Sequence, residues 1–333
     1  MKKLLSFALL GLISAAALPA QLINGAGSSF DNPAFSLWFD AYSKVDPSVH
    51  FNYQSIGSGA GQKQLLAQTV DFGASDAPMT DAAMAGAPSP ILHIPVVAGA
   101  VVISYNLPGS PALRLDGATL ADIFLGSVTK WNDGKIAALN PGVSLPDLPI
   151  IVVHRSDGSG TSFIFTDYLC SISPEWSQKV GKSTSVSWPT GLGGKGNEGV
   201  AGQVKQLPGA IGYVELAYAE QNKLPFATLK NAAGNFIKAS PEAVSKAMAT
   251  ATIPDDFRFS MVNAPGDQAY PISGASWVLI FQKQTKPEIG RKLVSFLKWA
   301  VTEGQKISPQ LSYAPLPENV QSRELKLLDT VTF

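Results

Sequence analysis

The stretch of sequence that decides the fold is IIVVHRSDGSGTSF, residues 150–163. Its four leading β-branched residues are typical of a buried strand, and the polar glycine loop that follows leads into a helix that we expect to begin near Gly160. Along the rest of the chain, short apolar runs alternate with amphipathic stretches, and no internal repeat appears. This alternation predicts an α/β architecture, in which ligands bind beyond the carboxyl ends of the strands.

The loop from Arg155 to Thr161 has the composition of an anion-binding site. The start of a helix offers unpaired N–H groups and a partial positive charge, and Gly160 lets the backbone approach a ligand closely. Ser159 and Thr161 would add hydroxyl donors. Arg155 would add a charged bidentate fork, which Asp157 could hold in place. The same residues would also suit an ordinary capping loop with a surface Arg–Asp pair, and this segment alone does not decide between the two.

Similar donor groups occur at other points where a strand is expected to end or a helix to begin. Residues 25–30 read GAGSSF and place Ser29 and Phe30 before the first expected helix. Residues 57–61 read GSGAG and place Ser58 before the second. Glycine and serine are ordinary turn residues, so each segment alone is a weak signal. Together they predict hydroxyl and N–H donors at several strand ends.

Asp76, at the end of the expected strand 70–74, differs from these donors because it carries a negative charge. A carboxylate that faces an anion repels it by several kcal/mol unless one of the two holds a proton. Phosphate retains a proton near neutral pH and can donate it to Asp76, whereas sulfate has none to give. Asp76 would then select for a protonated ligand, although an exposed turn aspartate before Pro78 is the commoner use of such a residue.

The length of the chain favours two lobes. After removal of a leader, the remainder of the 333 residues exceeds what one hydrophobic core usually serves. Apolar β-branched runs at residues 93–105 and 276–281 could cross between the lobes. We therefore expect a discontinuous first lobe of residues 21–103 plus 273–333 and a second lobe of residues 104–272.

The N-terminus has the layout of a secretory signal peptide. Two lysines precede an apolar stretch that ends in small residues at Ala17 or Ala20, and this stretch is shorter than the roughly 20 residues of a membrane anchor. We expect residues 1–20 to be this leader. Cys170 is the one cysteine, so we expect a buried thiol, no intramolecular disulfide and no lipid anchor. An exported protein without an anchor would diffuse away unless an outer membrane confined it, so we expect this protein in the periplasm.

Charge and motifs argue against several other classes of protein. The chain has 25 basic and 25 acidic residues, which disfavours nucleic acid as a partner. Residues 194–199 match G-x-G-x-x-G, but no convincing strand precedes them, so no dinucleotide site is expected. The sequence has no G-x-S-x-G or H-E-x-x-H, and its histidines, His50, His93 and His154, form no evident catalytic pair. We expect no cofactor, no metal and no catalytic residue.

Six segments of the chain occur in an order that is typical of one family. They are residues 25–30, 57–61, 69–78, 155–163, 191–199 and 208–215. In this order they resemble the periplasmic phosphate-binding proteins that serve bacterial high-affinity phosphate ABC transporters, and the resemblance runs from about Ile23 to near the C-terminus. It implies a type 2 periplasmic binding protein fold, in which two α/β lobes are joined by a two-strand hinge and phosphate is held in the cleft between them.

Carried over position by position, the resemblance implies a set of phosphate-binding residues. In that family's arrangement Asp76 would accept the phosphate proton, Arg155 would provide the charge, and Asp157 would orient Arg155. Two positions depart from the pattern, since Ser29 stands where threonine is expected and His154 stands where another basic residue is expected. The binding residues implied are Ser29, Phe30, Ser58, Asp76, Arg155, Ser159, Gly160 and Thr161.

We therefore expect a periplasmic receptor that binds inorganic phosphate and delivers it to an inner-membrane permease, as a monomer and without catalysis. Two alternatives from other classes remain open at this point. One is a secreted phosphatase that uses Ser159 or Ser58 as its nucleophile. The other is a surface adhesin or signalling component that binds phosphate without transporting it.

Overall fold

A computed structural model of the chain describes residues 20–333, and its central feature is an eight-stranded sheet. The strands lie in the order β2-β1-β3-β11-β4-β8-β6-β7, and a separate three-stranded sheet has the order β10-β9-β5. The strands are β1 Gln21–Gly27, β2 Val49–Ser55, β3 Phe72–Ser75, β4 Ile91–Tyr105, β5 Arg114–Leu115, β6 Ile151–Arg155, β7 Leu192–Gly194, β8 Ala210–Glu215, β9 Thr228–Lys230, β10 Phe236–Ile237 and β11 Ser273–Phe281.

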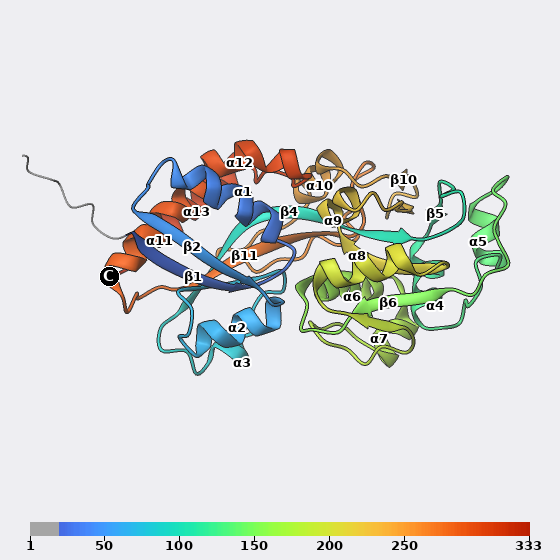
Figure 1. Cartoon of the computed structure of the whole chain (residues 1–333), viewed down its shortest axis with the longest axis horizontal. Coiled ribbons are helices and arrows are strands. Elements are labelled where there is room, and N and C mark those ends of the chain that lie inside the picture. The colour runs from blue at the N-terminus through green and yellow to red at the C-terminus, as the bar shows by residue number, and fades with distance from the viewer. Residues whose placement is uncertain (1–19) are drawn as a thin grey trace, which may run out of the picture.

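Strand β4 connects the two ends of this sheet. Its residues 91–100 pair antiparallel with β11, and its residues 101–105 pair antiparallel with β8. On either side of this centre the strands are parallel, since β1 pairs with β2 and β3, and β6 pairs with β7 and β8. Figure 1 shows β4 and β11 running between the two halves of the molecule. The carboxyl ends of β1, β3 and β6 carry the loops that were expected to bind a ligand.

Helices cover both halves of the sheet (Figure 1). The last long one, α11, presents Leu293, Phe296, Leu297 and Ala300 to the core, as the helical spacing of these residues predicts. The helices are α1 Asn32–Ser43, α2 Ser58–Leu66, α3 Asp81–Met84, α4 Gly117–Phe124, α5 Gly134–Leu139, α6 Gly160–Ile172, α7 Pro174–Lys179, α8 Gly196–Gln206, α9 Leu216–Gln221, α10 Pro241–Met248, α11 Pro287–Ala300, α12 Glu303–Ile307 and α13 Glu318–Leu328, and a 3₁₀ turn spans Ser308–Leu311.

Two local expectations differ from the structure. Ser58 was expected before the second helix, but α2 begins at Ser58 itself, because Gly57 takes a φ of 91° that turns the chain directly into the helix. Cys170 is half-buried and not fully buried. The expected start of α6 at Gly160 is confirmed.

The expected leader at residues 1–20 lies almost entirely outside the described residues. Within residues 20–333, none of the helices has the length and hydropathy needed to cross a bilayer.

Candidate functional site

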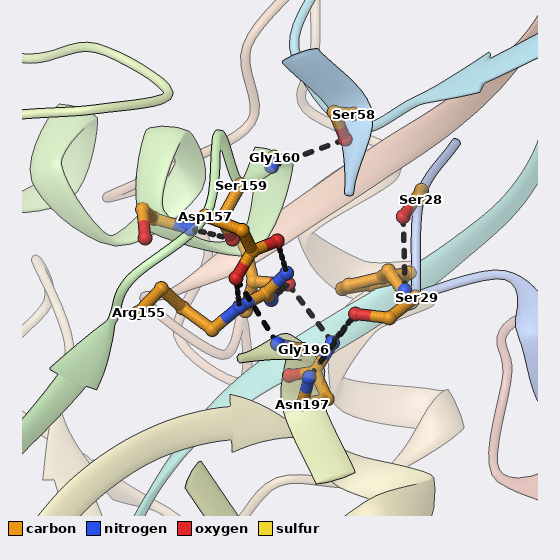
Figure 2. Close-up of polar contacts among 12 residues, drawn as sticks. Ser28, Ser29, Ser58, Arg155, Asp157, Ser159, Gly160, Gly196 and Asn197 are labelled. Carbon is orange, nitrogen blue, oxygen red and sulfur yellow. Dashed lines mark hydrogen bonds and ion pairs between the residues drawn. The ribbon is translucent and has the colours of Figure 1, made fainter. Parts of the chain in front are cut away.

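Arg155 and Asp157 form the charged centre of the candidate site. Arg155 ends β6, and its Nε and Nη2 donate to the two carboxylate oxygens of Asp157 at 2.8 and 2.5 Å. The Arg155 side chain is only 1% exposed. Burial alone would raise the pKa of Asp157, but the hydrogen bonds and the charge of Arg155 outweigh burial and lower it. A bidentate pair of this kind fixes the guanidinium plane, so Arg155 is held in one orientation (Figure 2).

The first turn of α6 lies beside Arg155. Arg155 Nη1 donates to Thr161 Oγ1 at 3.3 Å. Ser159 caps the helix, because its Oγ accepts a hydrogen bond from the Ser162 amide at 3.0 Å. A hydroxyl that accepts a hydrogen bond still has its own proton to donate. Ser159 can therefore cap its helix and donate to a ligand at the same time.

Ser58 joins the loop after β3 to the start of α6. Its Oγ accepts from the amides of Asp76 and Gly160, at 3.1 Å each, and Figure 2 shows the contact with Gly160. The neighbouring Gly59 amide donates to the Gly158 carbonyl at 2.8 Å. Both oxygen–amide contacts leave the Ser58 proton free for another acceptor. The loops from the two halves of the sheet thus meet directly at this point.

Ser29 and Phe30 approach from the carboxyl end of β1. Ser29 Oγ accepts from the backbone amide of Asn197 at 3.1 Å and from its side-chain amide at 3.0 Å (Figure 2). The same side-chain amide donates to Thr161 Oγ1 at 3.1 Å, and the Phe30 amide donates to Ser28 Oγ at 2.9 Å. Asn197 therefore links the loop after β1 to the start of α6.

Asp76 places a carboxyl group among these donors. It is 1% exposed, and its Oδ1 accepts from the hydroxyls of Ser28 at 2.5 Å and Ser276 at 2.6 Å. Burial raises the pKa of Asp76 to about 6, although the two serine hydroxyls and the charge of Arg155 oppose this rise. The group is thus mainly ionised at neutral pH, and it is ready to accept a proton from a ligand.

All of the residues that the sequence singled out lie in one connected network. They come from the loops after β1, β3 and β6 and from the starts of α2 and α6. The residues are Ser29, Phe30, Ser58, Asp76, Arg155, Asp157, Ser159, Gly160 and Thr161. His154 lies away from the Arg155 side chain, as strand alternation predicts, and its ring stacks on Trp188 with centroids 4.9 Å apart.

Sequence reasoning missed three residues of this network. Ser28 is adjacent to Ser29 and was not considered separately, although its hydroxyl reaches Asp76. Asn197 lies within the segment 191–199, whose resemblance to the family was the available signal. Ser276 gave no signal, because it is an ordinary residue of β11 and lies 200 positions from its partner Asp76.

Metal binding has no support in the part of the chain that the structure describes. Among residues 20–333, no group of three or more His, Cys, Asp or Glu side chains is arranged to hold a metal ion. The network consists of hydroxyl, amide and guanidinium donors and of two carboxyl groups, of which Asp157 is paired with Arg155 and Asp76 is not.

Comparisons with known proteins show which family the chain resembles in sequence. Residues 14–303 match the model of the PBP superfamily domain. The phosphate-binding protein PstS of Pasteurella multocida is 46% identical over 323 residues, which cover 96% of this chain and 93% of that protein. The phosphate-binding protein PstS of Xylella fastidiosa is 48% identical over 305 residues, which cover 90% of this chain and 82% of that protein.

A solved structure agrees on the fold. The phosphate-binding protein of Stenotrophomonas maltophilia aligns with a TM-score of 0.71 at 19% identity, over 92% of this chain and 94% of that one. This likeness confirms the type 2 periplasmic binding protein fold expected from the sequence. From the family model and the two relatives together, the chain belongs to the PBP superfamily and, within it, to the family of phosphate-binding proteins called PstS.

Proposed function

We propose that the chain is a periplasmic receptor that binds inorganic phosphate and delivers it to the membrane permease of a phosphate ABC transporter. The observation that carries this proposal is the position of the Asp76 carboxyl group, which is buried and whose Oδ2 lies against Gly160 at the start of α6. Such a site favours an anion that carries a proton and can donate it in a hydrogen bond to Asp76. The names of the relatives, which are phosphate-binding proteins, support the same ligand.

The proposed ligand contacts follow from the donors in the network. The amide of Thr161 would bind a phosphate oxygen at the start of α6, where the helix N-terminus favours an anion. The amides of Phe30 and Gly160, which donate to Ser28 Oγ and Ser58 Oγ in this structure, would exchange these partners for phosphate oxygens. The hydroxyls of Ser29, Ser58, Ser159 and Thr161 would add hydrogen bonds, and Arg155, held by Asp157, would neutralise charge. Phosphate would donate its proton to Asp76, whereas sulfate, which has none, would be repelled.

We propose that phosphate enters and leaves by movement of two lobes, residues 21–103 plus 273–333 and residues 104–272. The sheet supports this division, because β4 changes partner from β11 to β8 between Ala100 and Val101, and β11 begins at Ser273. Contacts such as Gly160 to Ser58 and Asn197 to Ser29 join the proposed lobes. Water exclusion on closure would strengthen every hydrogen bond to the anion.

The location and the partners are part of the same proposal. Export would use the leader at residues 1–20, and the mature receptor would act as a monomer that docks on the permease. The PstS family of the relatives supports a role in transport.

The rival proposal of a phosphatase has less support. The named relatives are binding proteins. The candidate nucleophiles Ser58 and Ser159 both accept hydrogen bonds from backbone amides. These bonds occupy oxygen lone pairs that a nucleophile would need and leave the hydroxyl protons free, so the two serines are better suited to donate hydrogen bonds to a ligand.

Isothermal titration of the mature protein with phosphate tests the proposal. Saturable binding of one phosphate per chain is the expected result. No binding, or steady release of phosphate from a chromogenic phosphomonoester that Ser159→Ala abolishes, would contradict it.

A further inference from the structure

Asp31 is a second buried carboxyl group beside the proposed phosphate site, and none of the contacts described so far uses it. It is 0% exposed, and neither of its carboxyl oxygens has a hydrogen-bond partner among residues 20–333. An aspartate in front of a helix usually caps it by accepting from the second or third amide of the first turn. Asp31 precedes α1 without making this bond, so its carboxyl group does not serve the helix.

The carboxyl group of Asp31 lies instead beside Ser276 and near Asp76. The Ser276 hydroxyl already gives its proton to Asp76 Oδ1, at 2.6 Å. What Ser276 can offer to Asp31 is therefore an oxygen lone pair. An ionised Asp31 would meet that lone pair and the negative charge of Asp76, whereas a protonated Asp31 could donate to the Ser276 oxygen.

The other groups around Asp31 do not supply a proton or a positive charge to it. The Tyr53 hydroxyl on β2 donates to the Ser28 carbonyl at 2.6 Å, and the Tyr313 hydroxyl, beyond the 3₁₀ turn, donates to the Phe30 carbonyl at 2.5 Å.

Two further ionisable groups lie in the surroundings of Asp76. Glu215, at the end of β8, is fully buried, and burial raises its pKa well above the usual value, while the positive charge of Arg155 is paired with Asp157. Burial raises the pKa of Asp31 well above its usual value, and the charge of Asp76 raises it further. A Ser276 proton turned toward Asp31 would lower this pKa, but the Ser276 hydroxyl donates to Asp76 Oδ1 instead.

We propose that Asp31 is a protonated positioning residue, whose proton turns toward the Ser276 oxygen and so helps to keep the Ser276 hydroxyl on Asp76 Oδ1. The chain Asp31 to Ser276 to Asp76 then occupies Oδ1 and leaves Oδ2 for the proton of the ligand. Asp76 Oδ2 faces the start of α6, since it lies 2.4 Å from the position of a Cβ on Gly160. Asp31 in its neutral form also leaves Asp76 as the one negative charge of the pair Asp31 and Asp76.

This inference rests on the proposed phosphate function, so phosphate binding by the unaltered protein is measured first. Two substitutions then test whether Asp31 acts as a hydrogen-bond donor or only fills the volume that it occupies. Asp31→Leu removes the donor, whereas Asp31→Asn keeps a neutral N–H donor at the same place. Asp40→Asn, on the exposed side of α1, is the matched control for the change of an aspartate to an amide.

The expected result is that Asp31→Leu binds phosphate less tightly than Asp31→Asn by about three- to tenfold, the effect of one lost hydrogen bond. Equal affinities of the two variants would overturn the positioning role. An affinity of Asp31→Asn that exceeds that of the unaltered protein tenfold or more would show that Asp31 carries a charge, and this too would overturn it.

Infrared difference spectra test the proton itself and do not depend on ligand affinity. The carbonyl band of a protonated carboxylic acid should be present at pH 7 in the unaltered protein and in Asp40→Asn, and should lose intensity in Asp31→Asn. Glu215 and Glu324 are buried too and could contribute to the same band. Only the intensity that is lost in Asp31→Asn is therefore assigned to Asp31. No loss of intensity would overturn the proposal. If the unaltered protein fails to bind phosphate, the proposed function is wrong, while this band still decides whether Asp31 holds a proton.

Discussion

Gly160 and Asp76 approach each other so closely that no side chain fits between them. A Cβ on Gly160 would lie 2.4 Å from Asp76 Oδ2 and 2.5 Å from Ser58 Oγ. These residues belong to the two lobes that we propose, so the contact is one of the places where the lobes meet. The start of α6 reaches the carboxyl group only because residue 160 is glycine.

Gly160→Ala should therefore weaken phosphate binding. Forcing a methyl group into this contact costs about 1–3 kcal/mol, which corresponds to an affinity loss of roughly five- to 150-fold. Titration calorimetry measures the loss. The matched control is Gly202→Ala on α8, where no atom lies within 4 Å of the added Cβ. That control should keep the affinity for phosphate, and a similar loss in both variants would contradict the argument.

Arg155→Lys should lower the affinity although it keeps the positive charge. The single nitrogen of lysine cannot form the two parallel N–H···O bonds by which the guanidinium and Asp157 hold each other, so the cation is no longer fixed in one orientation. We expect phosphate to bind about 10- to 100-fold more weakly, in line with the loss of a charge-assisted hydrogen bond. Arg291→Lys, an exposed change on α11, is the control. An unchanged affinity of Arg155→Lys would show that charge alone is sufficient.

Asp76→Asn should change how the stability of the ligand-free protein depends on pH. The pKa of Asp76 rises from 3.8 to about 6 on folding, so between these values the native state holds a proton that the unfolded chain has lost. The contribution of Asp76 to the free energy of unfolding therefore falls as the pH rises from about 4 to above 6. Asparagine does not titrate, so Asp76→Asn removes this dependence on pH.

Relative to the unaltered protein, the free energy of unfolding of Asp76→Asn should increase by roughly 2–3 kcal/mol between pH 4 and pH 7. Denaturant unfolding at a series of pH values measures this, with Asp40→Asn as the control. A difference that stays constant with pH would refute a raised pKa for Asp76.

Asn197→Ala should weaken phosphate binding by removing the link between Ser29 and Thr161. The side-chain amide of Asn197 bonds both hydroxyls, and its carbonyl oxygen accepts from the Glu215 amide at 3.0 Å. Loss of these buried hydrogen bonds should cost about 1–3 kcal/mol, seen as a lower affinity and a lower melting temperature. Asn132→Ala, in an exposed turn, should change neither. Full retention of both properties in Asn197→Ala would count against the link.

The sequence predicted the local parts of the site well, because neighbouring residues determine them. The strand 150–153, the glycine loop and the start of α6 at Gly160 follow from β-branched residues and helix-start chemistry. The pairing of Arg155 with Asp157 follows from their separation of two residues. It stays a prediction that eight of these residues bind phosphate while Asp157 supports Arg155, whereas the assembly of all nine into one network is observed.

Long-range contacts could not be predicted in the same way. Ser276 reaches Asp76 because β11 lies next to β3 in the sheet, and periodicity within a strand does not encode which strand is its neighbour. Asp31 was missed for a similar reason. Its environment depends on residues brought in by β2, β3 and β11, so an unpartnered buried acid is visible only once the chain is folded.

The central claim is that Asp76 makes the site require an anion that carries a proton, and competition between phosphate and sulfate tests it most directly. At pH 7 the unaltered protein should bind phosphate at least about 1000-fold more tightly than sulfate, as expected from several kcal/mol of charge repulsion. In Asp76→Asn this ratio should fall by at least about tenfold. Comparable affinities for the two anions in the unaltered protein, or an unchanged ratio in Asp76→Asn, would contradict the account.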